Sequence, residues 1–338
     1  MRLDLPLHTI GGDPGHSARV LAELGVSGAY SFEGPNDVFV PLIRAAGADL
    51  DLYSNIAVSF PRSPVHLAHT AWDLARLTSG RFFLGLGSQI RPHIERRYGS
   101  VFDHPAARMA DQVDAIKAIF ARWQDGTPLD HRGRFWTIDL MPPLFDPGPL
   151  VWGPPPVLVA AVGPLMTKAA VEHADGILLH PFTTDAFVDQ DSLAQIAQSQ
   201  LAQSQIAQPG PTDSFTVIGG SIVALAGGSI SQHDADEAAR GLVAFYGSTP
   251  AYRPVLEREG LGELQPLLRV MTKENRWEDM AELISDEVLD LIVIRGQADE
   301  VAERLRRRFG DRVDRVGVTI PHHVDPAVIE DLVRALAT

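Results

Sequence analysis

Hydrophobic and polar positions along the chain predict a repeating succession of strands and helices. Leu3, Leu5 and Leu7 alternate with polar residues, which is typical of a half-buried first strand. A loop and a short helix follow and end at Gly25. The next apolar segments predict strands at residues 26–32 and 50–60 and helices at residues 38–48 and 64–77. Strands and helices that alternate with short links indicate a parallel sheet with right-handed crossovers.

The alternation continues after a long insertion. A predicted helix over residues 106–123 is followed by a segment rich in Pro, Gly and aromatic residues. Such a segment inside a compact domain is usually functional or carries its own hairpin. Further elements are predicted at residues 157–162, 163–174, 175–182, 215–225, 234–245, 299–309 and 313–320, with a strand near Ile292. About eight strand–helix units predict an α/β fold, a (β/α)₈ TIM barrel spanning residues 1–338 as one domain, with an insertion at about 124–155.

An internal repeat lies between two of these elements. The sequence AQSQ recurs with a period of five over residues 196–208. That period does not match a helix, so its apolar residues form no continuous buried stripe. We expect a polar surface helix without a specific functional role.

Composition narrows the class of protein. The 338 residues are 45% hydrophobic, which is enough for a large core. A net charge of −14 argues against a nucleic-acid partner or an anionic membrane. With no Cys and no apolar run of transmembrane length, the sequence predicts neither disulfides nor a membrane span. We expect a soluble cytoplasmic protein.

Residues 80–93 are the clearest place where a predicted buried strand runs into a polar end. Phe83, Gly85 and Gly87 share one face of that strand, and the two glycines leave it bare. Ser88 and Gln89 follow at its carboxyl end. A flat ring or a phosphate fits such a backbone face, whereas the alternative interpretation is that the glycines only relieve crowding in a packed sheet.

A second segment predicts an anion site. An apolar strand passes through Ala160, Ala161 and Val162 to Gly163 and Pro164, which begin a helix. That geometry directs free N–H groups and the positive end of the helix dipole at one point. Barrels commonly bind phosphate at the loops of their later strands.

Other polar residues have two interpretations each. His8 and His180 follow predicted strands, and each is either a satisfied structural His or a catalytic group. Glu33 follows the second strand, where a half-buried carboxyl can transfer protons. It can equally cap the next helix or pair with an Arg. The remaining histidines lack carboxylate ligands at suitable spacing, so no metal site is predicted.

Four segments together resemble the luciferase-like monooxygenase superfamily, and more specifically its branch that depends on the deazaflavin coenzyme F420. They are LGLGSQ, AVSFPRSP, VAAVGP followed by ADG, and HRGRFWTIDLMPP. The resemblance covers nearly the whole chain. It implies a bacterial luciferase-like (β/α)₈ barrel with insertions, usually dimeric, with the cofactor ring at the carboxyl ends of the strands.

The resemblance also implies a set of cofactor contacts. The third strand of this family usually ends in a non-prolyl cis peptide, a position that Ala57–Val58 matches. The full set implied by the resemblance is Ala57, Val58, Gly85, Gly87, Ser88, Gln89, His93, Ala160, Ala161, Val162, Gly163 and Pro164.

The chain departs from the family in the residues that move protons. Sugar-phosphate and alcohol dehydrogenases of this branch carry a His after strand two and a Glu past the fourth-strand glycines. Here Glu33 and, approximately, Ile90 stand at these places. The candidate catalytic residues are therefore Glu33, His8 and His180.

Hydride transfer between F420 and an unidentified small organic substrate is the function that the resemblance implies. The alternatives are an FMN-dependent luciferase-like monooxygenase and a cofactor-binding protein without turnover. The expected partners are a small-molecule substrate and a second copy of the chain, with no nucleic acid and no membrane.

Overall fold

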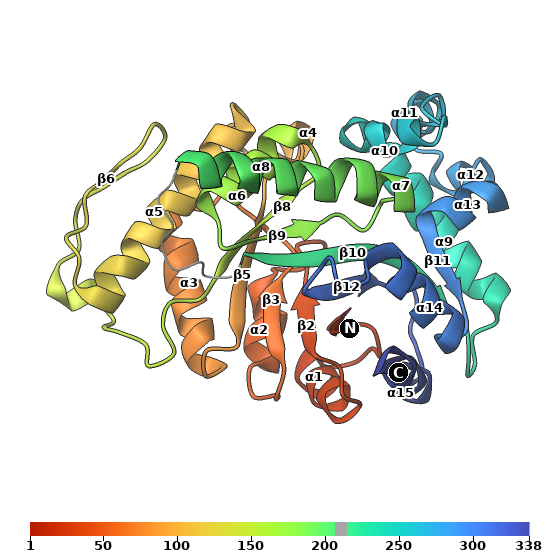
Figure 1. Ribbon diagram of the computed structural model, residues 1–338, viewed down its shortest axis with the longest axis horizontal. Coiled ribbons are helices and arrows are strands. Elements are labelled where there is room, and N and C mark those ends of the chain that lie inside the picture. The colour runs from red at the N-terminus through yellow and green to blue at the C-terminus, as the bar shows by residue number, and fades with distance from the viewer. Residues whose placement is uncertain (207–214, 338) are drawn as a thin grey trace. The chain divides into compact units, whose positions relative to one another are not determined.

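The structure is a computed structural model that describes residues 1–206 and 215–337. Its core is a parallel sheet that closes into a ring (Figure 1). The strands follow the order β1-β2-β3-β5-β8-β9-β10-β12, and β12 pairs with β1. The ring strands are β1 (Leu3–Pro6), β2 (Gly28–Ser31), β3 (Asp51–Ser54), β5 (Phe82–Gly87), β8 (Val157–Ala161), β9 (Gly176–Leu179), β10 (Thr216–Leu225) and β12 (Arg315–Thr319). The predicted (β/α)₈ barrel is therefore confirmed for the described residues.

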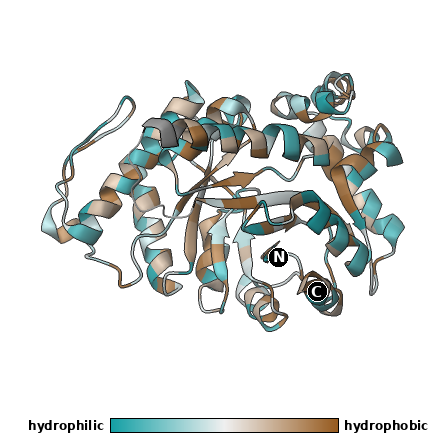
Figure 2. Cartoon of the chain, viewed as in Figure 1, coloured by the Kyte–Doolittle hydropathy of each residue, from teal (hydrophilic) through white to brown (hydrophobic). Residues whose placement is uncertain are grey.

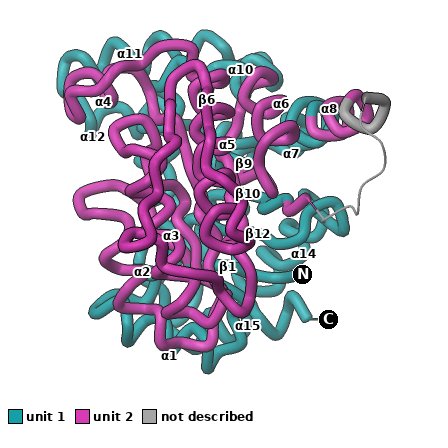
Figure 3. Tube along the Cα trace, turned by 90° about the vertical axis from the view of Figure 1, so that its left-hand side faces the viewer, with its two compact units in different colours: residues 1–29, 179–195, 217–338 teal, residues 30–178, 196–216 magenta. Residues whose placement is uncertain are grey.

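Two short strands extend this ring. β4 (Ala57–Val58) continues the third strand and pairs with β5, and β11 (Val293–Gly296) pairs with the carboxyl-terminal half of β10. The chain also divides into two compact units (Figure 3). Unit 1 comprises residues 1–29, 179–195 and 217–338, and unit 2 comprises residues 30–178 and 196–216. Each unit is described by itself below.

The helices of unit 2 follow the predicted alternation closely. α3 begins where predicted, because the Ser63 side chain accepts the His66 N–H at 3.2 Å and Pro64 suits a first helical position. Its buried residues recur at helical spacing, as in Leu67, Ala71 and Leu74. The unit 2 helices are α2 (Phe39–Ala45), α3 (Pro64–Leu77), α4 (Arg91–Arg96), α5 (Pro105–Asp125) and α6 (Pro164–His173). Phe82, Phe83, Leu84 and Leu86 make β5 mainly hydrophobic, whereas the helices carry both hydrophobic and hydrophilic residues (Figure 2).

The insertion in unit 2 carries the hairpin that its composition predicted. β6 (His131–Arg132) pairs antiparallel with β7 (Thr137–Ile138), and a 3₁₀ turn η1 (Pro143–Phe145) follows. The buried Asp111 of α5 holds the hairpin by accepting hydrogen bonds from the His131 ring and from the Phe135 and Trp136 N–H groups. A Cβ on Gly133 would lie 1.6 Å from an Asp111 oxygen, so only glycine fits this contact.

Within the described residues, all helices after β10 belong to unit 1. Residues 249–295, where the sequence pattern is unclear, form the 3₁₀ helix η3, the four α-helices α10 to α13 and most of β11. The helices of unit 1 are α1 (Pro14–Glu23), α7 (Asp185–Phe187), η2 (Val188–Ser192), η3 (Pro250–Tyr252), α9 (Gln232–Gly247), α10 (Arg253–Arg258), α11 (Leu264–Lys273), α12 (Trp277–Glu282), α13 (Asp286–Ile292), α14 (Ala298–Phe309) and α15 (Pro326–Ala337).

The first strand differs from the half-buried strand that its alternation predicted. All of β1 is buried, including Asp4, which is 0% exposed. Arg315 of β12 donates to both Asp4 carboxylate oxygens, at 2.7 and 2.8 Å, and is itself buried. This bidentate ion pair compensates the buried charge of Asp4, which the alternating pattern of β1 would place in solvent.

The repeat forms a helix, α8 (Leu193–Ile206), as predicted up to its last described residue; residues 207 and 208 of the repeat lie outside the described part of the chain. None of the helices within residues 1–206 and 215–337 combines the length and apolarity needed to span a bilayer.

Candidate functional site

A break in the third barrel strand lies beside β5. β3 ends at Ser54 and β4 begins at Ala57, and the peptide bond between Asn55 and Ile56 is cis. The prediction of a cis bond at Ala57–Val58 is therefore wrong. These two residues are extended, because they pair in parallel register with Leu86 and Gly87 of β5.

The glycines of β5 do not leave an open face. A Cβ on Gly85 would lie 1.9 Å from the Ser54 carbonyl oxygen, and one on Gly87 would lie 2.6 Å from the Ile56 side chain. Ser54 Oγ also bonds both the carbonyl oxygen and the N–H of Gly85, at 2.8 and 3.0 Å. The predicted bare face for a ring is wrong, because the broken strand fills it. The alternative interpretation, relief of crowding, fits the structure, and cofactor contact by these glycines stays a prediction for their backbone atoms alone.

The turn after β5 is tightly organised. Gln89 has a φ of +56°, a left-handed conformation that non-glycine residues seldom adopt. Its side-chain oxygen accepts the Ile90 N–H at 3.0 Å, and Ser88 Oγ donates to the Gln89 carbonyl at 3.2 Å. His93 is half-buried on α4, where desolvation and then the charge of Arg97 lower its pKa. His93 is therefore mainly neutral at pH 7.

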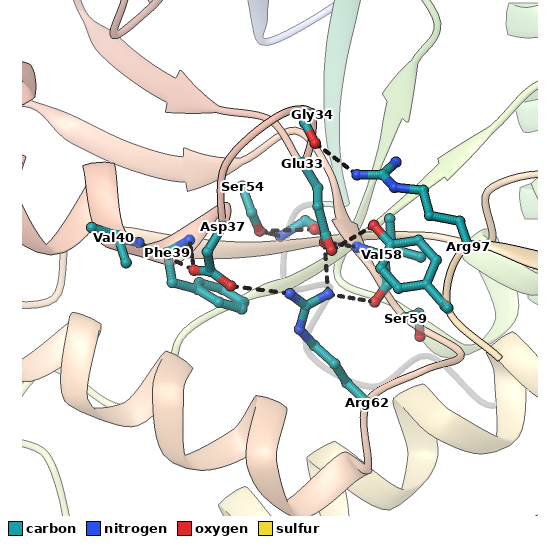
Figure 4. Close-up of polar contacts among 12 residues, drawn as sticks. Glu33, Gly34, Asp37, Phe39, Val40, Ser54, Val58, Ser59, Arg62 and Arg97 are labelled. Carbon is teal, nitrogen blue, oxygen red and sulfur yellow. Dashed lines mark hydrogen bonds and ion pairs between the residues drawn. The ribbon is translucent and has the colours of Figure 1, made fainter. Parts of the chain in front are cut away.

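Glu33 is the centre of a hydrogen-bonded group in unit 2 (Figure 4). Its Oε2 accepts the backbone N–H of Val58 at 2.8 Å and Arg62 Nη1 at 2.6 Å. Its Oε1 accepts the hydroxyl of Tyr98 at 2.8 Å. The Glu33 side chain is only 6% exposed. Of the roles left open for this residue, pairing with an Arg is the one that the structure shows.

The partners of Glu33 extend the group to neighbouring elements. Arg62 also donates to the Val58 carbonyl at 2.9 Å and to Asp37 Oδ2 at 3.2 Å. Asp37 in turn accepts the Phe39 N–H at the start of α2, at 2.8 Å. Burial, followed by the hydrogen bond to Glu33, raises the pKa of Tyr98 to about 12. The group therefore joins the loop after β2 to β4, α2 and the segment after α4.

The predicted anion turn after β8 is open to solvent. Ala161 is buried and Ala160 and Val162 are half-buried, whereas Gly163 and Pro164 are exposed at the start of α6. A Cβ on Gly163 would meet no atom within 4 Å.

This turn also offers free hydrogen-bond donors. The Gly163 carbonyl accepts the N–H groups of Met166 and Thr167, at 3.1 and 3.0 Å. Within the described part of the chain, the N–H groups of Gly163 and Leu165 have no acceptor. The first turn of α6 thus presents two free donors and empty space together.

His8 lies in unit 1, just after β1, and its side chain is exposed. Desolvation by the surrounding protein, followed by repulsion from the charge of His323, lowers the pKa of His8. The His323 ring also packs against Gly11, where a Cβ would lie 3.2 Å from it. His8 is therefore mainly neutral at pH 7.

His180 also lies in unit 1, directly after β9, within a cluster of aromatic rings. The Tyr252 ring stacks on it at 4.2 Å, and the Tyr246 ring meets it edge-on at 4.9 Å. The backbone N–H of Phe182 donates to His180 Nδ1 at 3.1 Å. Desolvation by these surroundings lowers the pKa of His180 to about 3.

Sequence reasoning missed Tyr98, Tyr246 and Tyr252. No motif marks them, and Tyr252 falls in the part of the chain without a clear pattern. A signal for Tyr246 would have been its place on the helix after a barrel strand. Residues 1–206 and 215–337 contain no group of three His, Asp or Glu side chains that would hold a metal ion.

Comparison with known proteins agrees with the barrel fold. Residues 15–315 match the family described as luciferase-like monooxygenase. An uncharacterized protein of Mycobacterium tuberculosis is 41% identical over 302 residues, which cover 89% of this chain and 87% of that protein. The 5,10-methylenetetrahydromethanopterin reductase of Archaeoglobus fulgidus is 28% identical over 267 residues, covering 76% of this chain and 71% of the reductase.

A solved structure supports the architecture. The coenzyme F420-dependent tetrahydromethanopterin reductase of Methanopyrus kandleri superposes with a TM-score of 0.78 at 18% identity, and the match covers 99% of this chain and 98% of the reductase. The match to residues 15–315 covers well over half of the sequence. The chain therefore belongs to the luciferase-like monooxygenase family.

Proposed function

We propose that this chain is an oxidoreductase that uses coenzyme F420 to transfer a hydride to or from a small organic substrate. Membership of the luciferase-like family supports an enzyme of this class. The preference for F420 is supported by the similarity to methylenetetrahydromethanopterin reductase, since the Methanopyrus kandleri reductase on the same fold is named as F420-dependent. The proposed cofactor site lies entirely within unit 2.

One observation carries the proposal: β5 and β8 are paired neighbours in parallel register, with Gly85 opposite Leu158. Their carboxyl ends therefore meet at one edge of the barrel, where Gln89 follows one strand and Gly163 follows the other. Active sites of (β/α)₈ barrels lie at this edge.

The residues at this edge fit the phosphate that F420 and FMN both carry. The free N–H groups of Gly163 and Leu165 are donors for its oxygens, and the empty space beside Gly163 leaves room for them. The positive end of the α6 dipole favours the same charge. Ser88, Gln89 and His93 are the polar groups that we propose beside the ring, which supplies the hydride chemistry when bound.

Glu33 has a supporting role in this proposal. Its carboxylate already accepts hydrogen bonds from the Val58 N–H, from Arg62 and from the Tyr98 hydroxyl. We infer that it holds the β4 backbone in place. His8 and His180 remain the candidates for contact with the reacting substrate, and both are neutral at pH 7.

The chain purified from a host that makes F420 provides the test. We expect the retained ligand to be F420 by absorbance and mass spectrometry, and the Kd for F420 to be at least about tenfold below that for FMN. Retention of FMN, with the tighter Kd, would favour the second candidate, an FMN-dependent monooxygenase, which the family description supports. If neither F420 nor FMN binds, both the proposed F420-dependent oxidoreductase and the FMN-dependent monooxygenase are contradicted.

We also propose that the chain forms a homodimer, as the family resemblance implies. Val40 and Ile43 on α2 and Leu77 on α3 are more than half exposed, and Ile43 and Leu77 line one surface groove. Light scattering of Ile43→Glu against Leu144→Glu, an exposed site in the insertion, tests this assignment. Loss of the dimer in Ile43→Glu but not in Leu144→Glu supports the proposed dimer surface. A wild-type chain that is monomeric in solution contradicts the homodimer.

A further inference from the structure

The aromatic cluster around His180 contains polar atoms without partners in the protein. Within the described residues, His180 Nε2 and the hydroxyls of Tyr246 and Tyr252 form no hydrogen bond with another residue. None of these three atoms is fully shielded from solvent, although burial raises the pKa of both Tyr side chains. Rings that are packed on most sides, with polar atoms that lack partners, are typical of a ligand-binding surface.

The surroundings of His180 fix its orientation and its tautomer. Nδ1 accepts the Phe182 N–H at 3.1 Å, so the proton of the neutral ring is on Nε2. The stacked Tyr252 ring, tilted by only 25°, holds the plane of the imidazole. The backbone is also held, because a Cβ on Gly220 would lie 2.1 Å from the Leu179 carbonyl oxygen. His180 therefore presents one hydrogen-bond donor in a defined position at the carboxyl end of β9.

We propose that His180 Nε2 donates a hydrogen bond to a carbonyl or hydroxyl oxygen of an uncharged substrate, while Tyr246 and Tyr252 keep the imidazole in place. That the ligand is a substrate rests on the proposed oxidoreductase function. Binding of an uncharged ketone or alcohol at His180 does not depend on that function.

The charge of the cluster selects this class of ligand. Burial lowers the pKa of His180, and within residues 1–206 and 215–337 no charged side chain contributes to this shift. An anionic head group would be desolvated there without a counter-charge. A cation would face the positive edge of the Nε2–H bond. An uncharged carbonyl or hydroxyl oxygen suits the Nε2–H donor, because a neutral imidazole polarises a carbonyl without transferring a proton.

The experiment compares three probes that differ only in their head group: cyclohexanone, cyclohexanecarboxylate and cyclohexylammonium. Binding to the full chain is followed by the side-chain Nε2–H signal of His180 in ¹⁵N NMR, assigned by its loss in His180→Gln. We expect cyclohexanone to shift this signal and to bind at least about tenfold more tightly than either charged probe. Equal or tighter binding of either charged probe would overturn the proposal. So would an unchanged signal at the solubility limit of cyclohexanone.

Two substitutions of His180 separate its nitrogen atoms. His180→Gln places an amide N–H near the position of Nε2. His180→Asn places an amide oxygen near the position of Nδ1 and leaves no group at the position of Nε2. We expect His180→Asn to weaken cyclohexanone binding about tenfold or more, and His180→Gln to weaken it less. Equal affinity of His180→Asn and the wild type would contradict the donor role. Tyr252→Leu keeps the donor but removes the stacked ring, so it gives a second test by weaker binding if His180→Asn does not fold.

A titration with F420 in the same samples distinguishes this inference from the proposed function. Binding of F420 without any effect of cyclohexanone on His180 would contradict the inference alone. A cyclohexanone effect at His180 without binding of F420 would contradict the proposed function alone.

Discussion

Glu33 Oε2 accepts the backbone N–H of Val58 at 2.8 Å, so a carboxylate from the loop after β2 fixes the short strand β4. The same oxygen accepts Arg62 Nη1 at 2.6 Å, which joins an ion pair to this backbone contact. A carboxylate with these partners and 6% exposure is suited to support the barrel.

Substitution of Glu33 tests this supporting role. In Glu33→Gln one oxygen becomes an NH₂ group that faces Arg62 or Tyr98, so a buried hydrogen bond is lost and the Arg62 charge loses its main partner. We expect the free energy of unfolding in urea to fall by about 2 kcal/mol. Asp37→Asn is the matched control, because the more exposed Asp37 also pairs with Arg62, and its loss is expected to stay below about 1 kcal/mol. Wild-type stability together with lost turnover would instead assign proton transfer to Glu33.

Glycine substitutions test the closed face of β5. In Gly85→Ala the added Cβ would lie 1.9 Å from the backbone oxygen of Ser54, which belongs to β3, the strand that pairs with β5. We expect a loss of at least about 3 kcal/mol in unfolding free energy. Gly163→Ala, where a Cβ meets nothing within 4 Å, is expected to cost less than about 1 kcal/mol. A Gly85→Ala variant as stable as the wild type would show that the face is open after all.

A pH-dependent contribution to stability is expected from His173 and Asp114. The His173 Nδ1 lies 2.9 Å from both Asp114 oxygens, and this hydrogen bond raises the pKa of His173 above 6.5. The contribution is therefore fully present below pH 6.5 and is lost as the pH rises through the folded-state pKa. Because the pair is partly exposed, we expect Asp114→Asn to cost less than about 1 kcal/mol near pH 5.5 and still less near pH 9. Thermal unfolding at both pH values checks this, and an equal loss at both would contradict it.

The hydrophobic pattern was sufficient to predict the barrel. Each buried strand and its following helix bring their own periodicity and end signals, as Ser63 and Pro64 do for α3. Asp4 was misassigned because the partner that buries it, Arg315, comes from the far end of the sequence. Pairings at such separation leave no mark in a local pattern.

The site was less predictable than the fold for the same reason. Gly85 and Gly87 were correctly identified as special, but the Ser54 and Ile56 atoms that fill their face belong to another strand. The tyrosines around His180 come from segments that carry no motif. Gly163 was more accessible to sequence reasoning, because a strand, a glycine and a helix start are consecutive in the chain.

We propose that F420 binds with its phosphate at the first turn of α6. The most direct measurement is a fluorescence titration of F420 and of FMN into the wild type, Gly163→Asp and Gly47→Asp at fixed salt. Gly47 is a matched control in the same unit, because it is also exposed and has nothing within 4 Å of an added Cβ. Unlike Gly163, which follows β8, Gly47 precedes β3 and so lies before the amino end of a barrel strand. We predict that Gly163→Asp weakens F420 binding at least tenfold, about 1.4 kcal/mol, while Gly47→Asp stays within about twofold and the wild type prefers F420. An unchanged Kd in Gly163→Asp, or tighter binding of FMN than of F420 by the wild type, would contradict the account.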